Sequence, residues 1–239
     1  MSFFGTGCSH WSYILEQGKD QVALWAKARP NQKVLQDQKV AQEDKDKIRK
    51  IEEYRTYFYN YWGLPERMIY VDTIFLPREE VSTMVVVAPF NEVKSQEECF
   101  ALVGCFPYLG FFSRDSAINY SRLKEKEGWI TSITPIYAYS TLGHFDDPIY
   151  SSFFRFTSKE LAELIFHELF HSIFFVKSET ELNENLADFF AEEMAFQYFQ
   201  YSPEGKIKEL QKRKNKTALR TLMQQLIKEL NATYQKENP

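Results

Sequence analysis

The segment His167-Glu168-Leu169-Phe170-His171 carries the residues best suited to chemistry. Two imidazoles four residues apart leave the same face of a helix, one turn above the other. Neutral imidazole nitrogens bind zinc at about 2.0–2.1 Å, so this spacing suits a single metal ion. Glu168 lies beside the pair, where a carboxylate can take a proton from water activated by the metal. The pattern therefore predicts a zinc-dependent hydrolase, and most simply a peptidase.

A third candidate ligand follows a short polar connector. Glu184 and Asp188 are four residues apart in a second predicted helix, so they share a face. Two antiparallel helices joined by a short loop can bring Glu184 opposite the two histidines. Two histidines and one glutamate leave the fourth position of zinc open, which is typical of catalytic sites. Asp188 can accept a hydrogen bond from the outer nitrogen of a ligating histidine and so fix its tautomer.

Two simpler interpretations remain open for these residues. The histidines are two of only four in the chain, and a buried, hydrogen-bonded pair without metal is the alternative. Glu184 taken alone also suits a solvated acid near a helix N-terminus, where the helix dipole favours negative charge. The three cysteines have no zinc-finger spacing, so no rival ligand set competes. We therefore expect one zinc ion per chain, held by His167, His171 and Glu184.

The elements that must position these residues are predicted to be two helices. Thr157-Ser158-Lys159-Glu160 has the form of a capping box, and no proline or glycine interrupts residues 157–176. That stretch is apolar on most faces, which predicts a buried helix on which the histidines and Glu168 are polar exceptions that need partners. A second helix is expected from Glu181 to about Tyr201, where Ser202-Pro203 ends it.

The remaining chain predicts an α+β protein, with a small twisted sheet packed beside the helical layer that holds both helices. One domain over residues 1–239 is expected, with two small lobes as the alternative, and residues 204–239 as peripheral helices. Further helices are predicted at 8–29, 31–62 and 116–127, and strands at 68–76, 83–88, 101–103, 108–112 and 129–139. Pro135 limits the last strand to an edge or a bulge, and an edge strand can pair with an extended peptide.

Composition excludes some partners and leaves the compartment open. The net charge is −4, and no basic cluster of the density needed for nucleic-acid binding is present. No apolar run approaches the roughly 18 residues of a membrane span. Thr6-Gly7-Cys8-Ser9 resembles a bacterial lipoprotein cleavage point, with residues 1–7 as a remnant too short for a signal peptide. Lipidation of Cys8 would anchor the chain to a membrane in the periplasm or cell envelope. If instead Met1 is the native N-terminus, we expect a cytoplasmic protein.

If Cys8 is lipidated, Cys99 and Cys105 are left as an even pair. They are six residues apart across an expected strand and turn, and a small-loop disulfide would form there in an oxidising compartment. Two buried free thiols are the alternative, because free cysteine is among the most buried residue types.

Several stretches together resemble the bacterial family of predicted zinc aminopeptidases, a lipoprotein-like group of glu-zincin type. The matching stretches are Gly7-Cys8-Ser9, residues 103–112, residues 138–148 with Ala138-Tyr139-Ser140-Thr141-Leu142-Gly143, residues 164–171 and residues 183–187. The resemblance implies a zincin-like fold, peptide substrates and the ligands already named, with Glu168 moving the proton. Tyr137, Tyr139 and His144 are candidate donors to the oxyanion. Tyr139 is preferred because it lies in the most family-specific stretch, with packing of the tyrosine as the alternative role.

Two classes of function follow from these residues. The first is a zinc metallopeptidase, and within it an aminopeptidase that captures the free α-ammonium of its substrate with a carboxylate, for which Asp146, Asp147 and several glutamates are candidates. The alternative is a non-catalytic zinc-binding scaffold or binding protein of the cell envelope. A protein that hydrolyses no peptide, or whose zinc has all four positions filled by protein, would belong to the second class.

Overall fold

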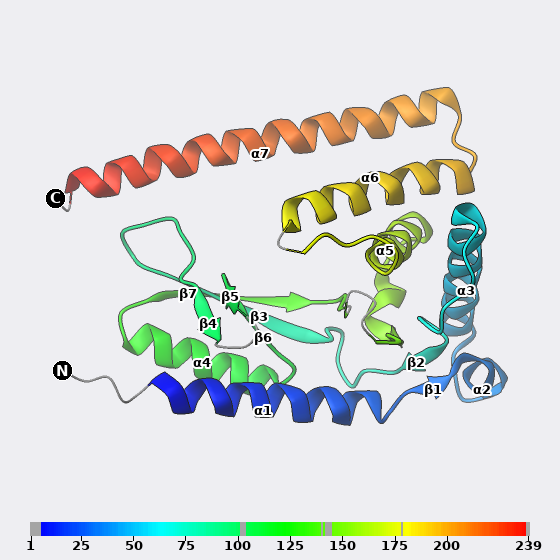
Figure 1. Cartoon of the computed structure of the whole chain (residues 1–239), viewed down its shortest axis with the longest axis horizontal. Helices are drawn as coiled ribbons and strands as arrows, with labels where there is room; N and C mark the ends of the chain where they lie inside the picture. The colour runs from blue at the N-terminus through cyan, green and yellow to red at the C-terminus, as the bar shows by residue number, and fades with distance from the viewer. Residues whose placement is uncertain (1–5, 101–103, 140, 142–144, 178, 238–239) are drawn as a thin grey trace. The chain divides into compact units, whose positions relative to one another are not determined.

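The computed structural model describes residues 6–100, 104–139, 141, 145–177 and 179–237, and it has an α+β fold (Figure 1). The chain forms two compact units. Unit 1 comprises Met1–Gln21, Ser82–Ile136 and Ser202–Pro239, and unit 2 comprises Val22–Val81 and Tyr137–Tyr201. All the candidate metal ligands belong to unit 2.

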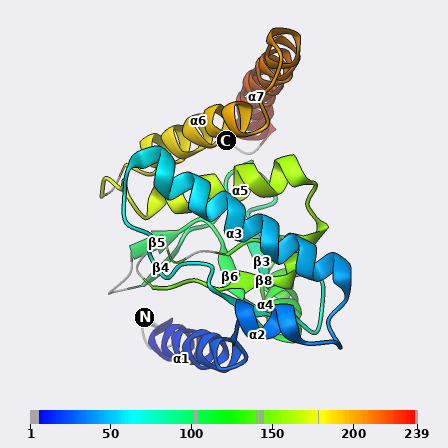
Figure 2. The same cartoon turned by 90° about the vertical axis from the view of Figure 1, so that its right-hand side faces the viewer.

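Unit 2 is a helical layer with a small sheet. Its elements are β1 (Arg29–Pro30), α2 (Asn31–Gln36), α3 (Gln42–Trp62), β2 (Asp72–Ile74), β8 (Ile149–Tyr150), the 3₁₀ helix η1 (Ser151–Arg155), α5 (Ser158–His171) and α6 (Thr180–Tyr198). The strand order is β1-β2-β8, in which β2 pairs antiparallel to β1 and parallel to β8. Helix α5 packs against both α3 and α6, and Figure 2 shows α3 lying across α5.

The core of unit 2 lies where α3 meets α5. Tyr54 and Phe58 of α3 are buried, as are Ile165, Phe166 and Leu169 of α5. The rings of Tyr54 and Phe166 meet edge to face with centroids 6.0 Å apart. Burying one such side chain stabilises the fold by roughly 1.5–3 kcal/mol, so α5 is held firmly by its apolar side. The rigid helix leaves its polar residues in defined positions.

The start of α5 has the predicted capping box. The Thr157 hydroxyl accepts a hydrogen bond from the backbone N–H of Glu160, and the Glu160 carboxylate accepts one from the backbone N–H of Thr157. Two helix-end donors are thereby satisfied. The hydrogen bonds that the Glu160 carboxylate accepts from the backbone N–H and the hydroxyl of Thr157 hold the pKa of Glu160 below its ordinary value.

The end of α5 was predicted wrongly. The helix stops at His171 instead of continuing to Val176, and the side chains of Phe174, Phe175 and Val176 are exposed. The amides of Ser172 and Ile173 both donate to the carbonyl three residues earlier, which tightens the last turn and ends the helix. His171, the second candidate ligand, therefore lies at the C-terminus of its helix.

The helix expected over residues 31–62 is divided into α2 and α3. Asp37 ends α2 in an extended conformation. Its carboxylate accepts hydrogen bonds from the backbone N–H of Lys39 and from the Arg29 guanidinium at 2.7 Å. A short acidic side chain that bonds to nearby backbone competes with helix formation, and here the turn is the more stable outcome.

Unit 1 is built on a second small sheet. Its elements are the first part of α1 (Thr6–Trp25), β3 (Ser82–Ala88), β4 (Glu98–Phe100), β5 (Gly104–Phe106), β6 (Leu109–Phe111), α4 (Arg114–Lys126), β7 (Ile130–Ile136) and α7 (Pro203–Glu237). The strand order is β6-β3-β7, all antiparallel, with α4 packed against these strands (Figure 1). The core contains Val85, Val87, Leu109, Phe111 and Ala117.

The single sheet that we expected is therefore three small sheets. Strands β1, β2 and β8 form one, β6, β3 and β7 the second, and β4 and β5 the third. The expected strand 68–76 shrinks to the three residues of β2, because only Thr73 and Ile74 find partners on β8. Strand β7 contains Pro135 and lies at an edge of its sheet, as predicted from that proline.

The β4–β5 hairpin carries a disulfide. Cys99 and Cys105 lie directly opposite each other in the antiparallel pair and are bonded to one another. Both residues are exposed, so the alternative of two buried thiols is excluded. The strand predicted at 101–103 lies outside the described residues. Cys8 lies within α1. None of the described helices is both long and apolar enough to cross a bilayer.

Candidate metal site

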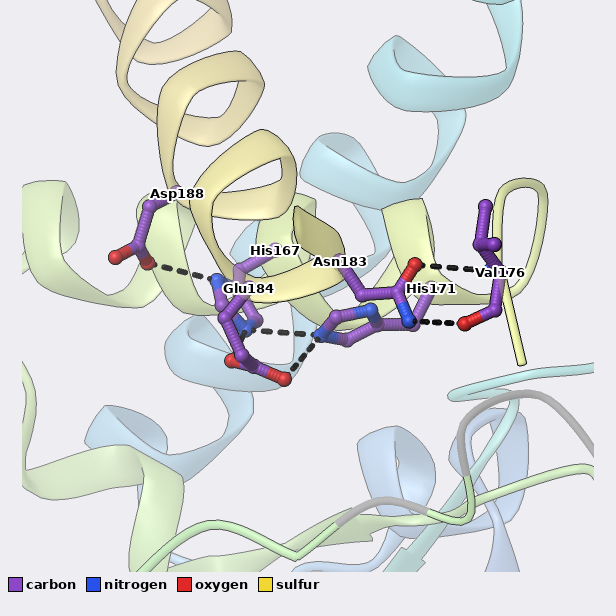
Figure 3. A network of polar contacts seen from close by, with 6 residues as sticks. All are labelled: His167, His171, Val176, Asn183, Glu184 and Asp188. Atoms are coloured by element: carbon purple, nitrogen blue, oxygen red, sulfur yellow. Dashed lines mark hydrogen bonds and ion pairs between the residues drawn. The ribbon is translucent and has the colours of Figure 1, made fainter. Parts of the chain in front are cut away.

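The polar residues of α5 and the start of α6 meet at one point (Figure 3). The Nε2 atoms of His167 and His171 are 3.1 Å apart. Each Nε2 is 3.3 Å from one carboxylate oxygen of Glu184. The structure thus brings together the three residues that the sequence nominated as ligands, and their ligand atoms all lie within 4.8 Å of one another.

These separations fit one small cation. Two atoms bound tetrahedrally to zinc at about 2.05 Å lie about 3.3 Å from each other. The observed 3.1 and 3.3 Å match that value. Three lone pairs that converge in this way repel one another unless a proton or a metal ion lies between them. Two imidazoles and a carboxylate are donors that a divalent metal ion such as zinc accepts, so the residues present fit a metal ion.

The outer nitrogen of His167 is held by Asp188. The Nδ1 atom lies 2.9 Å from Oδ1 of Asp188, so the imidazole donates there and directs the lone pair of Nε2 toward Glu184. Burial disfavours the charged ring, but the hydrogen bond to Asp188 and the charges of Glu168, Asp188 and Glu184 outweigh it and raise the pKa of His167. The hydrogen bond predicted for Asp188 is therefore present.

His171 is in a different environment. Its side chain is 2 % exposed, and its Nδ1 atom has no hydrogen-bond partner among the described residues. Burial and the neighbouring ring of His167 lower the pKa of His171. A neutral His171 beside a readily charged His167 is the expected result when two imidazoles compete for one proton.

Glu168, the candidate general base, is half-buried on α5 directly after His167. Its charge, after the dominant effect of burial, contributes to raising the pKa of Tyr70. Tyr70 is fully buried, its hydroxyl has no hydrogen-bond partner among the described residues, and its φ of 62° is rare for a residue other than glycine. Sequence reasoning missed Tyr70, because no local signal marks a left-handed tyrosine.

The candidate oxyanion donors lie in the segment before β8. Tyr139 is half-buried, with its ring 6.4 Å from that of Tyr150. The ring of Tyr137 is covered by the guanidinium of Arg155 at 3.6 Å. His144 lies outside the described residues. The role of Tyr139 stays a prediction.

Asp147 has a structural role that the sequence did not indicate. Its side chain is buried, and Oδ2 accepts hydrogen bonds from the backbone N–H and the hydroxyl of Thr141 at 2.8 and 2.9 Å. The backbone carbonyl of Asp147 accepts a further bond from the N–H of Tyr70. A carboxylate so enclosed is a poor receptor for a substrate ammonium, whereas Asp146 is exposed. Of the two aspartates, only Asp146 keeps that candidacy.

The described geometry defines an α+β protein with a histidine–glutamate cluster of metal-binding type on two packed helices. The family model described as "Putative aminopeptidase" matches residues 12–239, and the chain belongs to that family. No curated protein and no solved structure matches the chain.

Proposed function

We propose that this chain is a zinc-dependent metallopeptidase of zincin-like architecture, with His167, His171 and Glu184 as ligands of one zinc ion. The observation that supports it best is the convergence of three ligand atoms from two helices at separations of 3.1 and 3.3 Å. Membership of the aminopeptidase family supports peptide hydrolysis as the reaction.

The chain's own residues then have distinct tasks. Zinc held by the three ligands would polarise the scissile carbonyl and acidify water next to it. Glu168 takes the proton from that water and delivers it to the nitrogen of the leaving amine. Asp188 keeps the ring of His167 in the orientation and tautomer that a ligand needs. Tyr139 is our candidate for the second donor to the developing oxyanion.

We further propose that cleavage begins at a free N-terminus. The family description favours an exopeptidase, and an exopeptidase needs an anionic group that binds the substrate α-ammonium. Asp146, which is exposed in the segment between Tyr139 and β8, is one candidate. Peptides with blocked N-termini should then be hydrolysed much more slowly than the same peptides with free N-termini.

The test combines metal analysis with a panel of fluorogenic peptides. We expect about one zinc per chain, hydrolysis that a chelator abolishes and zinc restores, and a loss of at least about 100-fold in kcat for Glu168→Gln with zinc retained. Glu163→Gln is the matched control, because Glu163 is on the same helix and is paired with Lys159 at 2.7 Å. Zinc-loaded protein that cleaves no peptide would overturn the enzymatic proposal, and equal cleavage of blocked peptides would overturn only the exopeptidase part.

A further inference from the structure

Asn183, the residue before Glu184, is tied to the loop that leaves α5. The residue is 1 % exposed. Its Oδ1 atom accepts a hydrogen bond from the backbone N–H of Val176 at 2.9 Å, and its Nδ2 donates to the carbonyl of Val176 at 2.8 Å (Figure 3). One amide side chain thus satisfies both backbone groups of a loop residue in the way a neighbouring β-strand would.

The first turn of α6, which precedes the fully buried Ala187 and the contact between Asp188 and His167, has no side-chain cap. The residue before the helix, Glu179, makes no side-chain capping hydrogen bond. The side chains of Phe174, Phe175 and Val176 in the preceding loop are exposed, so their packing does not define where the helix begins. The carbonyl of Val176 also accepts the backbone N–H of Glu179 at 3.2 Å, and the carbonyl of Glu179 accepts the backbone N–H of Asn183 at 3.0 Å, so two consecutive turns join the ends of the clamp. The two bonds of Asn183 therefore hold the loop residue Val176 against the first turn of α6, which has no side-chain cap.

The position of this helix start decides whether Glu184 reaches the histidines. The Glu184 side chain is 51 % exposed, so its surroundings constrain it weakly. A slip of this first turn by one residue would rotate Glu184 by about 100° and move it about 1.5 Å along the helix axis. Either change exceeds the tolerance of a metal ligand, whose distance is fixed to about 0.2 Å.

We propose that Asn183 is a positioning residue for the metal site, which clamps the α5–α6 loop and so sets the place of Glu184 opposite His167 and His171. The inference rests on the proposed zinc function and adds to it a residue that contacts no ligand atom of the metal. Asn183 would act through Glu184 alone, and this dependence is what distinguishes positioning from a general contribution to stability.

A double-mutant cycle on zinc affinity tests that dependence. Zinc dissociation constants would be measured by competition with a chromophoric chelator for wild type, Asn183→Ser, Glu184→Gln and the double variant. Serine is too short to bridge both backbone groups of Val176. We expect Asn183→Ser to weaken binding about 10-fold or more, and the double variant to bind no more weakly than Glu184→Gln. Effects that multiply instead would overturn the proposal. Cobalt-substituted Asn183→Ser and Glu184→Gln should also share a visible spectrum that differs from wild type.

Asn31→Ser is the matched control. Asn31 is 2 % exposed in the same unit. Its amide nitrogen donates to the carbonyl of Tyr70 and to the Glu52 carboxylate, and its amide oxygen accepts from the Thr73 hydroxyl; none of these residues belongs to α5 or α6. It should lower the melting temperature while leaving zinc affinity within about twofold. Equal losses of affinity in Asn31→Ser and Asn183→Ser would show that the effect is only destabilisation. If the wild-type protein itself does not bind zinc, the proposed function is wrong, and the positioning role is not what has failed.

Asn183→Asp covers the case in which serine prevents folding. It keeps the size of the side chain but points an acceptor at the carbonyl of Val176. Added negative charge near a cation would by itself tighten zinc binding, whereas loss of the clamp weakens it. We expect weaker binding with a retained circular dichroism spectrum, and tighter binding would contradict the positioning role.

Discussion

Asp188→Asn should weaken zinc binding about tenfold without disturbing the orientation of His167. The substitution removes a charge but keeps an oxygen that can accept the hydrogen bond from Nδ1 of His167. In the wild-type structure this Nδ1 lies 2.9 Å from Oδ1 of Asp188. The distance from the carboxylate to the ion is the sum of this hydrogen bond, the width of the imidazole ring and a zinc–nitrogen bond of about 2.05 Å, which gives about 6.5 Å. The Asp188 side chain is 60 % exposed, so the dielectric constant is close to that of water. Coulomb's law then gives about 1.3 kcal/mol for a divalent cation, which is about tenfold in the dissociation constant.

The assay is competition between the protein and a chromophoric chelator at low and at high ionic strength. Asp188→Ala loses the hydrogen bond as well as the charge, and should cost about a further fivefold, corresponding to about 1 kcal/mol. At about 1 M salt the screening length falls to about 3 Å, so Asp188→Asn should approach wild type while Asp188→Ala stays weaker.

The control for this prediction is Glu193→Gln. Glu193 is nine residues beyond Glu184, on the opposite face of α6 and about 13 Å along its axis, so its charge is largely screened at the site. Equal affinities of Asp188→Asn and wild type at low salt would refute the reasoning. So would a loss in Glu193→Gln as large as that in Asp188→Asn.

Two other perturbations address the scaffold. Thr157→Ala removes the capping box of α5 and should lower the free energy of unfolding by about 1 kcal/mol with little change in zinc affinity, which denaturant titration and chelator competition would check. The pKa of Glu160 is depressed in the folded state, so the contribution of Glu160 to the free energy of unfolding is present at neutral pH and is lost as the pH falls through that depressed pKa. The difference in the free energy of unfolding between wild type and Thr157→Ala should therefore narrow below about pH 4.5. A difference that stays constant with pH would contradict this prediction. Tyr70→Phe deletes a buried hydroxyl that has no partner among the described residues, and should leave the free energy of unfolding unchanged or raise it by about 1 kcal/mol, whereas a loss of more than about 1 kcal/mol would reveal an unrecognised bond.

Features with local causes were predictable from the sequence. The capping box needs only Thr157 and Glu160 at the right spacing, and the structure has it. The histidine pair and Glu184 depend on helical periodicity and a short connector, and the structure places their ligand atoms together. The pairing of Cys99 with Cys105 was one of two alternatives, and a two-stranded hairpin with the cysteines directly opposite decides between them.

Features that depend on distant partners were not predictable. The apolar run after His171 has the composition of a buried helix, yet bonds of the last turn end the helix and leave Phe175 half exposed. The buried role of Asp147 depends on Thr141 across a loop, and nothing in the local sequence separates it from exposed Asp146. Asn183 stands in a run of polar residues, and only the backbone of Val176 explains its burial.

The three converging side chains all fall between positions 167 and 184, on helices that are neighbours along the chain. Closing so short a loop costs little chain entropy compared with joining remote segments. An ion bound there would cross-link α5 and α6 locally, and it could bring these two helices together before the sheets form. Stripping that ion should accordingly loosen α6 first, and hydrogen exchange would show it as protection lost in one hairpin while the α3–α5 core stays closed.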